Sequence, residues 1–297
     1  MTTPAQRRQE VEMPEGTPVQ GSPARRYYLI SQLKRLRART GLSQEEAAEE
    51  MGWHKSKVSR IENGKWKRLS GPEIDALCRF YTAPDELREE LTHIAKAASR
   101  NRFSAWWNAY EDIPGGAYYP LEYEADQIFE YTLGLFSGLA QHPDYIRALM
   151  GRGAVPDEAE RERRLQARVE RTRSILYREA PPRMWWVIDE PVLTCQVGGP
   201  KVMHTQLEHL LELSDHPRID LQVLPQSEGM SLNYGFCLLW IGDDRVGHVD
   251  VPPQGLLFDA PEDVQHHELR SNHLRAAAMS QERSRDLIRT RITELDA

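Results

Sequence analysis

The residues best suited to chemistry lie in one short basic stretch, residues 54–68. It carries six lysines or arginines against one acid, Glu62, although the chain of 297 residues has a formal net charge of −7. Lysine and arginine attract polyanions, and the arginine fork can donate two parallel hydrogen bonds. The wider segment 25–68 holds twelve basic and five acidic residues, a balance of +7 that leaves −14 for the remainder. This asymmetry predicts a small polyanion-binding module joined to an acidic body.

Five residues in and before this stretch meet the steric needs of two helices joined by a tight turn. Gln44 opens the first helix, Ala48 is small where the helices cross, and Gly52 lies in the turn, where positive φ costs glycine little. Val58 and Ile61 are β-branched and would pack the second helix into a core. Their joint spacing predicts a helix-turn-helix.

The same region resembles the Xre/Cro-type repressor domain. The matching stretches are LKRLRARTGLSQ (33–44), AAEEMGW (47–53) and KVSRIENG (57–64). The resemblance implies that the helix after the turn lies in the major groove of DNA. By position it implies that three residues contact base edges: Lys55, Ser56 and Arg60. It also implies a larger set of phosphate contacts: Gln44, His54, Lys57, Ser59, Lys65, Lys67 and Arg68.

The resemblance further implies a salt bridge between Arg37 and Glu62 that ties the first helix to the third, which would explain the lone acid in a basic run. With this pair, the structural set of the motif comprises Arg37, Ala48, Gly52, Val58, Ile61 and Glu62. One departure is His54, because the family usually has Ser or Thr there and histidine is a poorer N-cap. One recognition helix offers little surface, so we expect a homodimer on a palindromic operator in double-stranded DNA, with half-sites ~34 Å apart.

Helical periodicity surrounds the motif. Leu29, Leu33 and Leu36 lie at i, i+4 and i+7, which predicts a helix from Tyr27 that Thr40-Gly41 ends. Prolines near the first helical position mark two later helix starts, at Ser70-Gly-Pro-Glu and Ala83-Pro-Asp-Glu. We therefore predict an all-α, five-helix helix-turn-helix domain at residues 25–98. Residues 1–24 have four prolines and no period, and we expect a disordered leader.

An aromatic-rich linker or seam is predicted at residues 99–124. Seven of the 24 aromatic residues of the chain lie within residues 103–123. Two interpretations stay open: a ligand cage or partner groove, and an ordinary packing seam between domains or within a dimer. Aromatic side chains anchor both pockets and interfaces. The residues on which the choice depends are Trp106, Trp107, Tyr118 and Tyr119.

The rest of the chain predicts a mixed α/β domain with a small mixed sheet at residues 125–297. Helical patterns are expected over 121–150, 158–178, 200–213 and 261–295. Strands are expected over 184–188, 219–224, 236–241 and 246–251, the last two as a hairpin. The strand–helix–strand order around residues 184–224 predicts one crossover between parallel strands.

This second part resembles a domain of unknown function that follows such helix-turn-helix modules in actinobacterial regulators. The matching stretches are LFSGLAQHPDYIRALM (135–150), PPRMWWVIDEPVL (181–193), VGGPKVMHTQLEHLLEL (197–213) and DLQVLPQSEG (220–229). The resemblance implies a regulator, either a repressor or a developmental switch. Its body would sense a ligand or a small partner protein encoded nearby, an arrangement likened to toxin–antitoxin regulation.

Other protein classes find little support in the sequence. No apolar run approaches the ~20 residues that cross a bilayer, and the N-terminus lacks the apolar region of a secretory signal. Three widely spaced cysteines, Cys78, Cys195 and Cys237, are expected to be free thiols in a reducing cytosol. We therefore expect a cytoplasmic protein with no membrane partner, no cofactor and no metal.

Two rival functions stay open. The first is an antitoxin-like adaptor whose helix-turn-helix no longer reads DNA, and the second is a DNA-modifying or nucleotide-processing enzyme. For the enzyme, Asp189-Glu190 follow a predicted strand, but adjacent residues of an extended chain point to opposite faces. His204 and His209 are five residues apart, roughly 140° around a helix, so they cannot share a metal. We expect no catalytic activity.

Overall fold

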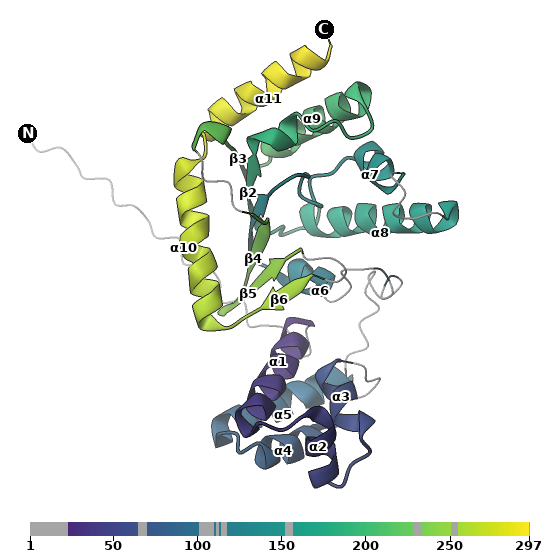
Figure 1. Ribbon diagram of the computed structural model, residues 1–297, viewed down its shortest axis with the longest axis vertical. Coiled ribbons are helices and arrows are strands. Elements are labelled where there is room, and N and C mark those ends of the chain that lie inside the picture. Colours follow the sequence, from purple (N-terminus) through teal and green to yellow (C-terminus); the bar gives the residue numbers. More distant parts are fainter. Residues whose placement is uncertain are drawn as a thin grey trace, which may run out of the picture.

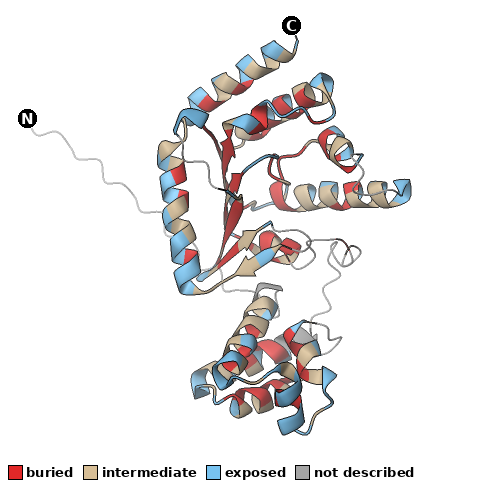
Figure 2. Ribbon diagram, in the orientation of Figure 1, coloured by how far each residue is buried: buried red, intermediate tan, exposed pale blue. Residues whose placement is uncertain are grey.

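The computed structural model describes residues 23–64, 70–100, 110, 113, 118–151, 157–228, 233–250 and 255–296. Figure 1 shows a helical domain at one end of the molecule and a sheet flanked by helices at the other. Buried residues form separate clusters in the two parts (Figure 2). The chain is therefore a multi-domain protein with an all-α N-terminal domain and a mixed α/β C-terminal domain, as predicted.

The N-terminal domain packs its described helices around one leucine-rich core. These helices are α1 (Pro23–Thr40), α2 (Gln44–Glu50), α3 (Ser56–Glu62), α4 (Gly71–Phe80) and α5 (Asp85–Arg100). Leu29, Leu33 and Leu36 of α1 are buried, as their spacing predicts. α1 ends at Gly41, whose φ of +75° is favourable for glycine. It begins at Pro23, four residues before the predicted start, because the first turn has no leucine to mark it.

The C-terminal domain is built on one mixed sheet of strand order β3-β2-β1-β4-β5-β6. The strands are β1 (Gln127–Thr132), β2 (Arg183–Asp189), β3 (Ile219–Leu224), β4 (Phe236–Ile241), β5 (Asp244–Val249) and β6 (Leu256–Phe258). β1, β2 and β3 are parallel, and β4, β5 and β6 follow as an antiparallel series beside β1. The predicted crossover between β2 and β3 and the β4–β5 hairpin are both present.

Helices cover both faces of this sheet. They are α6 (Tyr118–Glu124), α7 (Pro143–Met150), α8 (Glu158–Leu176), α9 (Pro200–Ser214), α10 (Pro261–Ala277) and α11 (Gln281–Leu295), with short 3-10 turns at Glu190–Leu193 and Gln226–Glu228. In Figure 1, α10 lies alone on one face, and α6 to α9 lie on the other. The larger core joins the sheet to α6, α7 and α9, and a smaller, aromatic core lies under α10. No helix in the described parts of the chain is long and apolar enough to span a membrane.

The structure corrects the prediction of a continuous helical region over residues 121–150. Residues 127–132 form β1, the strand between β2 and β4, and residues 133–142 are a loop before α7. Ile128 and Phe129 point to opposite faces, and both are buried because helices cover both sides of the sheet. Such a strand lacks the polar–apolar alternation that identifies a half-exposed one. Two smaller differences are that β5 begins at Asp244 and ends at Val249, and that β6 was not predicted.

The region predicted as one helix, 261–295, is two helices separated at residues 278–280. Ala278 ends α10 in an extended conformation, and the Ser280 side chain caps α11 by accepting from the Arg283 N–H. The break lets the chain cover the outer edge of β3, because the Met279 N–H donates to the Val223 carbonyl and the Ser284 hydroxyl accepts from the Val223 N–H. Both backbone groups of Val223, on the outer edge of β3, are therefore bonded by the chain's own groups.

Candidate nucleic-acid interface

The first helix of the motif, α2, is fixed at its start by a capping box. The Ser43 hydroxyl accepts from the Glu46 N–H at 3.2 Å, and the Glu46 carboxylate accepts from the Ser43 N–H at 2.8 Å. The backbone hydrogen bond from Ser43, with help from its side chain, lowers the pKa of Glu46. Glu46 therefore stays ionised at the helix end where the dipole favours negative charge.

The turn between α2 and α3 depends on a positive backbone angle at Gly52. Its φ is +63°, and a Cβ added there would meet nothing within 4 Å, so the requirement is conformational and not spatial. The Trp53 N–H then donates to the Ala48 carbonyl at 2.7 Å. Ala48 is completely buried, and Val58 and Ile61 of α3 are buried in the same core. The apolar residues of the predicted motif thus lie together beneath α3.

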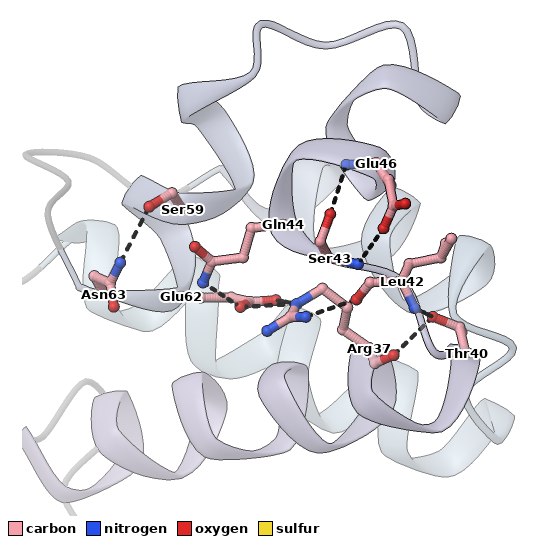
Figure 3. Close-up of polar contacts among 9 residues, drawn as sticks. All are labelled: Arg37, Thr40, Leu42, Ser43, Gln44, Glu46, Ser59, Glu62 and Asn63. Atoms are coloured by element: carbon pink, nitrogen blue, oxygen red, sulfur yellow. Dashed lines mark hydrogen bonds and ion pairs between the residues drawn. The ribbon is translucent and has the colours of Figure 1, made fainter.

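A buried carboxylate ties α1, α2 and α3 together (Figure 3). Glu62 of α3 is completely buried, and the Arg37 Nε atom donates to its two oxygens at 2.9 and 3.1 Å. The Gln44 amide donates to the same carboxylate at 2.8 Å, and Arg37 also donates to the Leu42 carbonyl at 2.7 Å. One N–H of Gln44 is used here, so its predicted phosphate contact would have to use the other.

His54 lies just before Lys55, the N-cap residue of α3, which makes no side-chain cap hydrogen bond. Its Nδ1 atom accepts from the Ser56 N–H at 3.3 Å and lies 2.8 Å from the Ser56 hydroxyl. With Nδ1 as an acceptor, the N–H of the ring is on Nε2. Because His54 is exposed, this Nε2–H is the group available to a phosphate. His142, by contrast, is the N-cap of α7, and its side chain accepts from the Asp144 N–H at 3.2 Å.

The exposed side of the motif carries the predicted base-contacting residues. Lys55, Ser56 and Arg60 are all exposed, and Ser56 and Arg60 are one turn apart on α3. Their side chains point away from the core that Val58 and Ile61 enter. This arrangement leaves one face of α3 free to enter a groove while the other face holds the domain together.

The predicted phosphate-contacting residues differ in their surroundings. The Lys57 ammonium is paired with Glu73 of α4 at 2.7 Å and lies 4.0 Å from the centre of the Trp53 ring. The Ser59 hydroxyl accepts from the Asn63 side chain at 3.2 Å. Sequence reasoning did not predict Glu73 as a partner, because it lies on another helix. Lys65, Lys67 and Arg68 lie outside the described residues.

Comparison with known families agrees with this geometry. Residues 30–91 match a family described as a helix-turn-helix domain, the domain of DNA-binding regulators. Residues 116–290 match a family described as a domain of unknown function, DUF5753, over more than half of the chain. The chain belongs to the DUF5753 family. No curated protein and no solved structure matches the chain.

The aromatic residues proposed as a ligand or partner site fall partly within the DUF5753 domain. Tyr118 and Tyr119 lie in α6 and are buried in the larger core. The Tyr118 hydroxyl donates to the Cys237 thiol at 3.1 Å, and its ring stacks on His248 with centroids 4.3 Å apart. Both side chains therefore pack inside the domain in this structure. Trp106 and Trp107 lie outside the described residues.

Of the two carboxylates considered for catalysis, Asp189 and Glu190, the second makes structural contacts in the DUF5753 domain. Glu190 accepts from the Gln226 N–H at 3.0 Å and pairs with Arg291 at 3.5 Å. Burial, followed by the nearby charge of Glu190, raises the pKa of Asp189. Within the described ranges, no three histidine, cysteine, aspartate or glutamate side chains are grouped as a metal site. The two ring nitrogens of His204 each lie 3.3 Å from a carboxylate oxygen, one of Glu208 and one of Asp296.

Proposed function

We propose that this protein is a sequence-specific transcriptional regulator of the Xre type that binds double-stranded DNA through α3. The observation that supports it is the division of α3 into two faces. Val58, Ile61 and Glu62 are locked into the domain, whereas Lys55, Ser56 and Arg60 are exposed. Rigid placement of a few exposed donors is what direct readout of base edges requires. Basic residues near α3 would supply the salt-dependent attraction to phosphates.

We further propose that the protein is a cytoplasmic homodimer that acts on a palindromic operator as a repressor or a developmental switch. One short recognition helix buries too little surface for tight and specific binding. In this proposal the DUF5753 domain is not an enzyme. It senses a ligand or a small protein encoded nearby, and needs neither metal nor cofactor.

The first test is selection of bound duplexes from a random library, followed by fluorescence anisotropy at fixed near-physiological salt. We expect an enriched palindromic motif, bound at least ~10³ times more tightly than an unrelated duplex of equal length. Failure to enrich any motif, with weak and equal binding to all duplexes, would overturn the proposal. That result would favour an antitoxin-like adaptor whose helix-turn-helix no longer reads DNA.

Substitution at Arg60 tests which residues contact base edges, and so select the sequence, and which contact only phosphates. Arg60→Ala is expected to weaken binding to the selected site by ~1–3 kcal/mol and to relax preference at one base position. Lys65→Ala is expected to weaken binding to all duplexes similarly. Arg173→Ala, which removes an exposed arginine of α8, is the matched control and should change neither quantity. If Arg60→Ala lowers the affinity for selected and for random DNA equally, Arg60 does not contact a base edge.

A further inference from the structure

α1 has a second face that does not belong to the N-terminal domain. Tyr27, Ser31 and Arg35 follow one another at intervals of four residues and therefore line one side of the helix. The leucines that enter the N-terminal core lie on the opposite side. The helix thus presents an apolar face to its own domain and a second face, with one aromatic and two polar side chains, to the other side.

This second face contacts the DUF5753 domain at the segment between β6 and α10. The Arg35 guanidinium pairs with the Asp259 carboxylate, and the Ser31 hydroxyl donates to the other oxygen of the same carboxylate at 2.5 Å. Asp259 keeps only 19% of its side-chain surface exposed, and Arg35 keeps 34%. One carboxylate therefore receives hydrogen bonds from two successive turns of α1.

Tyr27 extends the same contact into the apolar interior. It is partly buried and packs against the larger core of the DUF5753 domain. Burial raises the pKa of the Tyr27 phenol, and the charge of Asp259 raises it further while Arg35 lowers it. The phenol thus lies in the field of the Arg35–Asp259 pair. Figure 1 shows the first turns of α1 directed toward β6 and α6.

α1 is also bonded to the C-terminal end of α3 at two points. Arg37 donates to the buried Glu62, and Arg26 donates to the carbonyl of Gly64, just beyond the last residue of α3. Arg26 and Arg37 are eleven residues apart, about three helical turns, so they lie on the same side of α1. A change in the direction of α1 would therefore carry α3 with it.

We propose that Asp259 is a positioning residue, which through Ser31 and Arg35 of α1 holds α3 in one orientation relative to the DUF5753 domain. The consequence for DNA rests on the proposed function. In a dimer joined through the DUF5753 domains, fixed α3 helices would reach two half-sites at one separation only. A domain that moved on a linker would accept several separations, because the two heads could still bind simultaneously.

The test without DNA is the distance between two spin labels, one on each domain. Cys195 is exposed and can be labelled in the DUF5753 domain, whereas Cys78 and Cys237 are buried. Glu50→Cys, at an exposed position of α2, supplies the second label. Dilution with unlabelled protein removes distances between subunits. We expect one narrow distance distribution in the parent protein.

Variants of the contact then decide the proposal. Asp259→Ala and Arg35→Ala should each broaden the distribution, and the double variant should broaden it no further than Asp259→Ala, which already removes the bonds to both Ser31 and Arg35. Asp215→Asn is the control, because it removes an ion pair with Arg285, at 2.7 Å, that lies within the DUF5753 domain. Circular dichroism would establish that each variant is folded. A distribution for Asp259→Ala as narrow as that of the parent would overturn the proposal.

The test with DNA uses the selected operator with base pairs inserted or removed between its half-sites. The parent should prefer one spacing by about 100-fold, the lower end of what simultaneous binding of two modules provides. Asp259→Ala should reduce this preference to below about 10-fold while keeping the preferred base sequence. If the parent selects no sequence, the proposed function fails, but the spin-label distances still decide whether Asp259 positions α3. A spacing preference unchanged by Asp259→Ala would contradict the proposal.

Discussion

Arg37→Ala is the substitution whose effect follows most directly from the structure. Glu62 is completely buried. Arg37, whose own side chain is 19% exposed, donates two of the three hydrogen bonds that Glu62 accepts within the described residues. Removal of Arg37 leaves a buried carboxylate with the Gln44 amide as its remaining donor. Loss of one partner of a buried ion pair costs ~3–5 kcal/mol, because the other charge is left uncompensated. This is a large part of the ~5–15 kcal/mol that stabilises a typical domain.

The assay is urea unfolding, monitored by hydrogen exchange. Exchange in peptides from α1 and α3 reports on the N-terminal domain alone. With a slope of ~1–3 kcal/mol per molar urea, the midpoint of this domain should fall by more than about 1 M. Peptides from β1 and β2 should keep their midpoint.

The paired replacement Arg37→Met with Glu62→Gln provides the control. It removes both charges and keeps an acceptor for Gln44, so most of the lost stability should return. Two results would refute the reasoning: a loss below about 1 kcal/mol for Arg37→Ala, or a paired variant as unstable as the single one.

Three further predictions concern other parts of the molecule. Gly52→Ala should destabilise the N-terminal domain by ~1 kcal/mol in urea unfolding, because its φ is positive although a methyl group has room; no loss would show that the turn can relax. In the folded protein a thiol reagent at neutral pH should modify the exposed Cys195, whereas burial raises the pKa of the Cys237 thiol and keeps it unreactive until urea is added. Burial raises the pKa of Glu130 from 4.5 to about 7, so this group should make the DUF5753 domain less stable as the pH rises from about 5 to 8, by at most ~3 kcal/mol. Glu130→Gln should flatten that pH dependence of urea unfolding, and an unchanged profile would contradict the assignment.

The sequence could predict elements that signal themselves locally. β3 and β4 were predicted with their observed bounds, because β3 alternates and ends before a proline, and β4 is a short apolar run after a glycine. The helix-turn-helix was predictable because each of its positions has its own steric requirement. β1 could not be predicted, because a strand covered on both faces has no polar–apolar alternation. The residues on either side of it also have patterns typical of helices.

Contacts made across the fold were beyond the sequence for a different reason. Arg35 and Asp259 are 224 residues apart, and the local sequence around each gives no indication that the other is its partner. The same holds for Lys57 and Glu73, which meet because α3 and α4 both bury residues in the same core. Pairing of charges is decided by tertiary geometry, whereas composition shows only that both signs are present. The salt bridge between Arg37 and Glu62 was predicted from the resemblance to a family. Nothing in the spacing or surroundings of the two residues indicates that they pair.

Met279 and Ser284 bond the outer edge of β3 at Val223, and this has a consequence for the chain while it is being made. β3 ends at Leu224 and α11 begins at Gln281, so the strand leaves the ribosome nearly 60 residues before its cover. At 5–20 residues per second, synthesis of that interval takes roughly 3–12 s. Throughout it the nascent sheet has an apolar strand with unpaired backbone groups, which is a template for pairing with another chain. The hydrogen bonds of Met279 and Ser284 to β3 therefore form after synthesis of the sheet. During this interval the nascent chain is most open to aggregation or to binding by a chaperone.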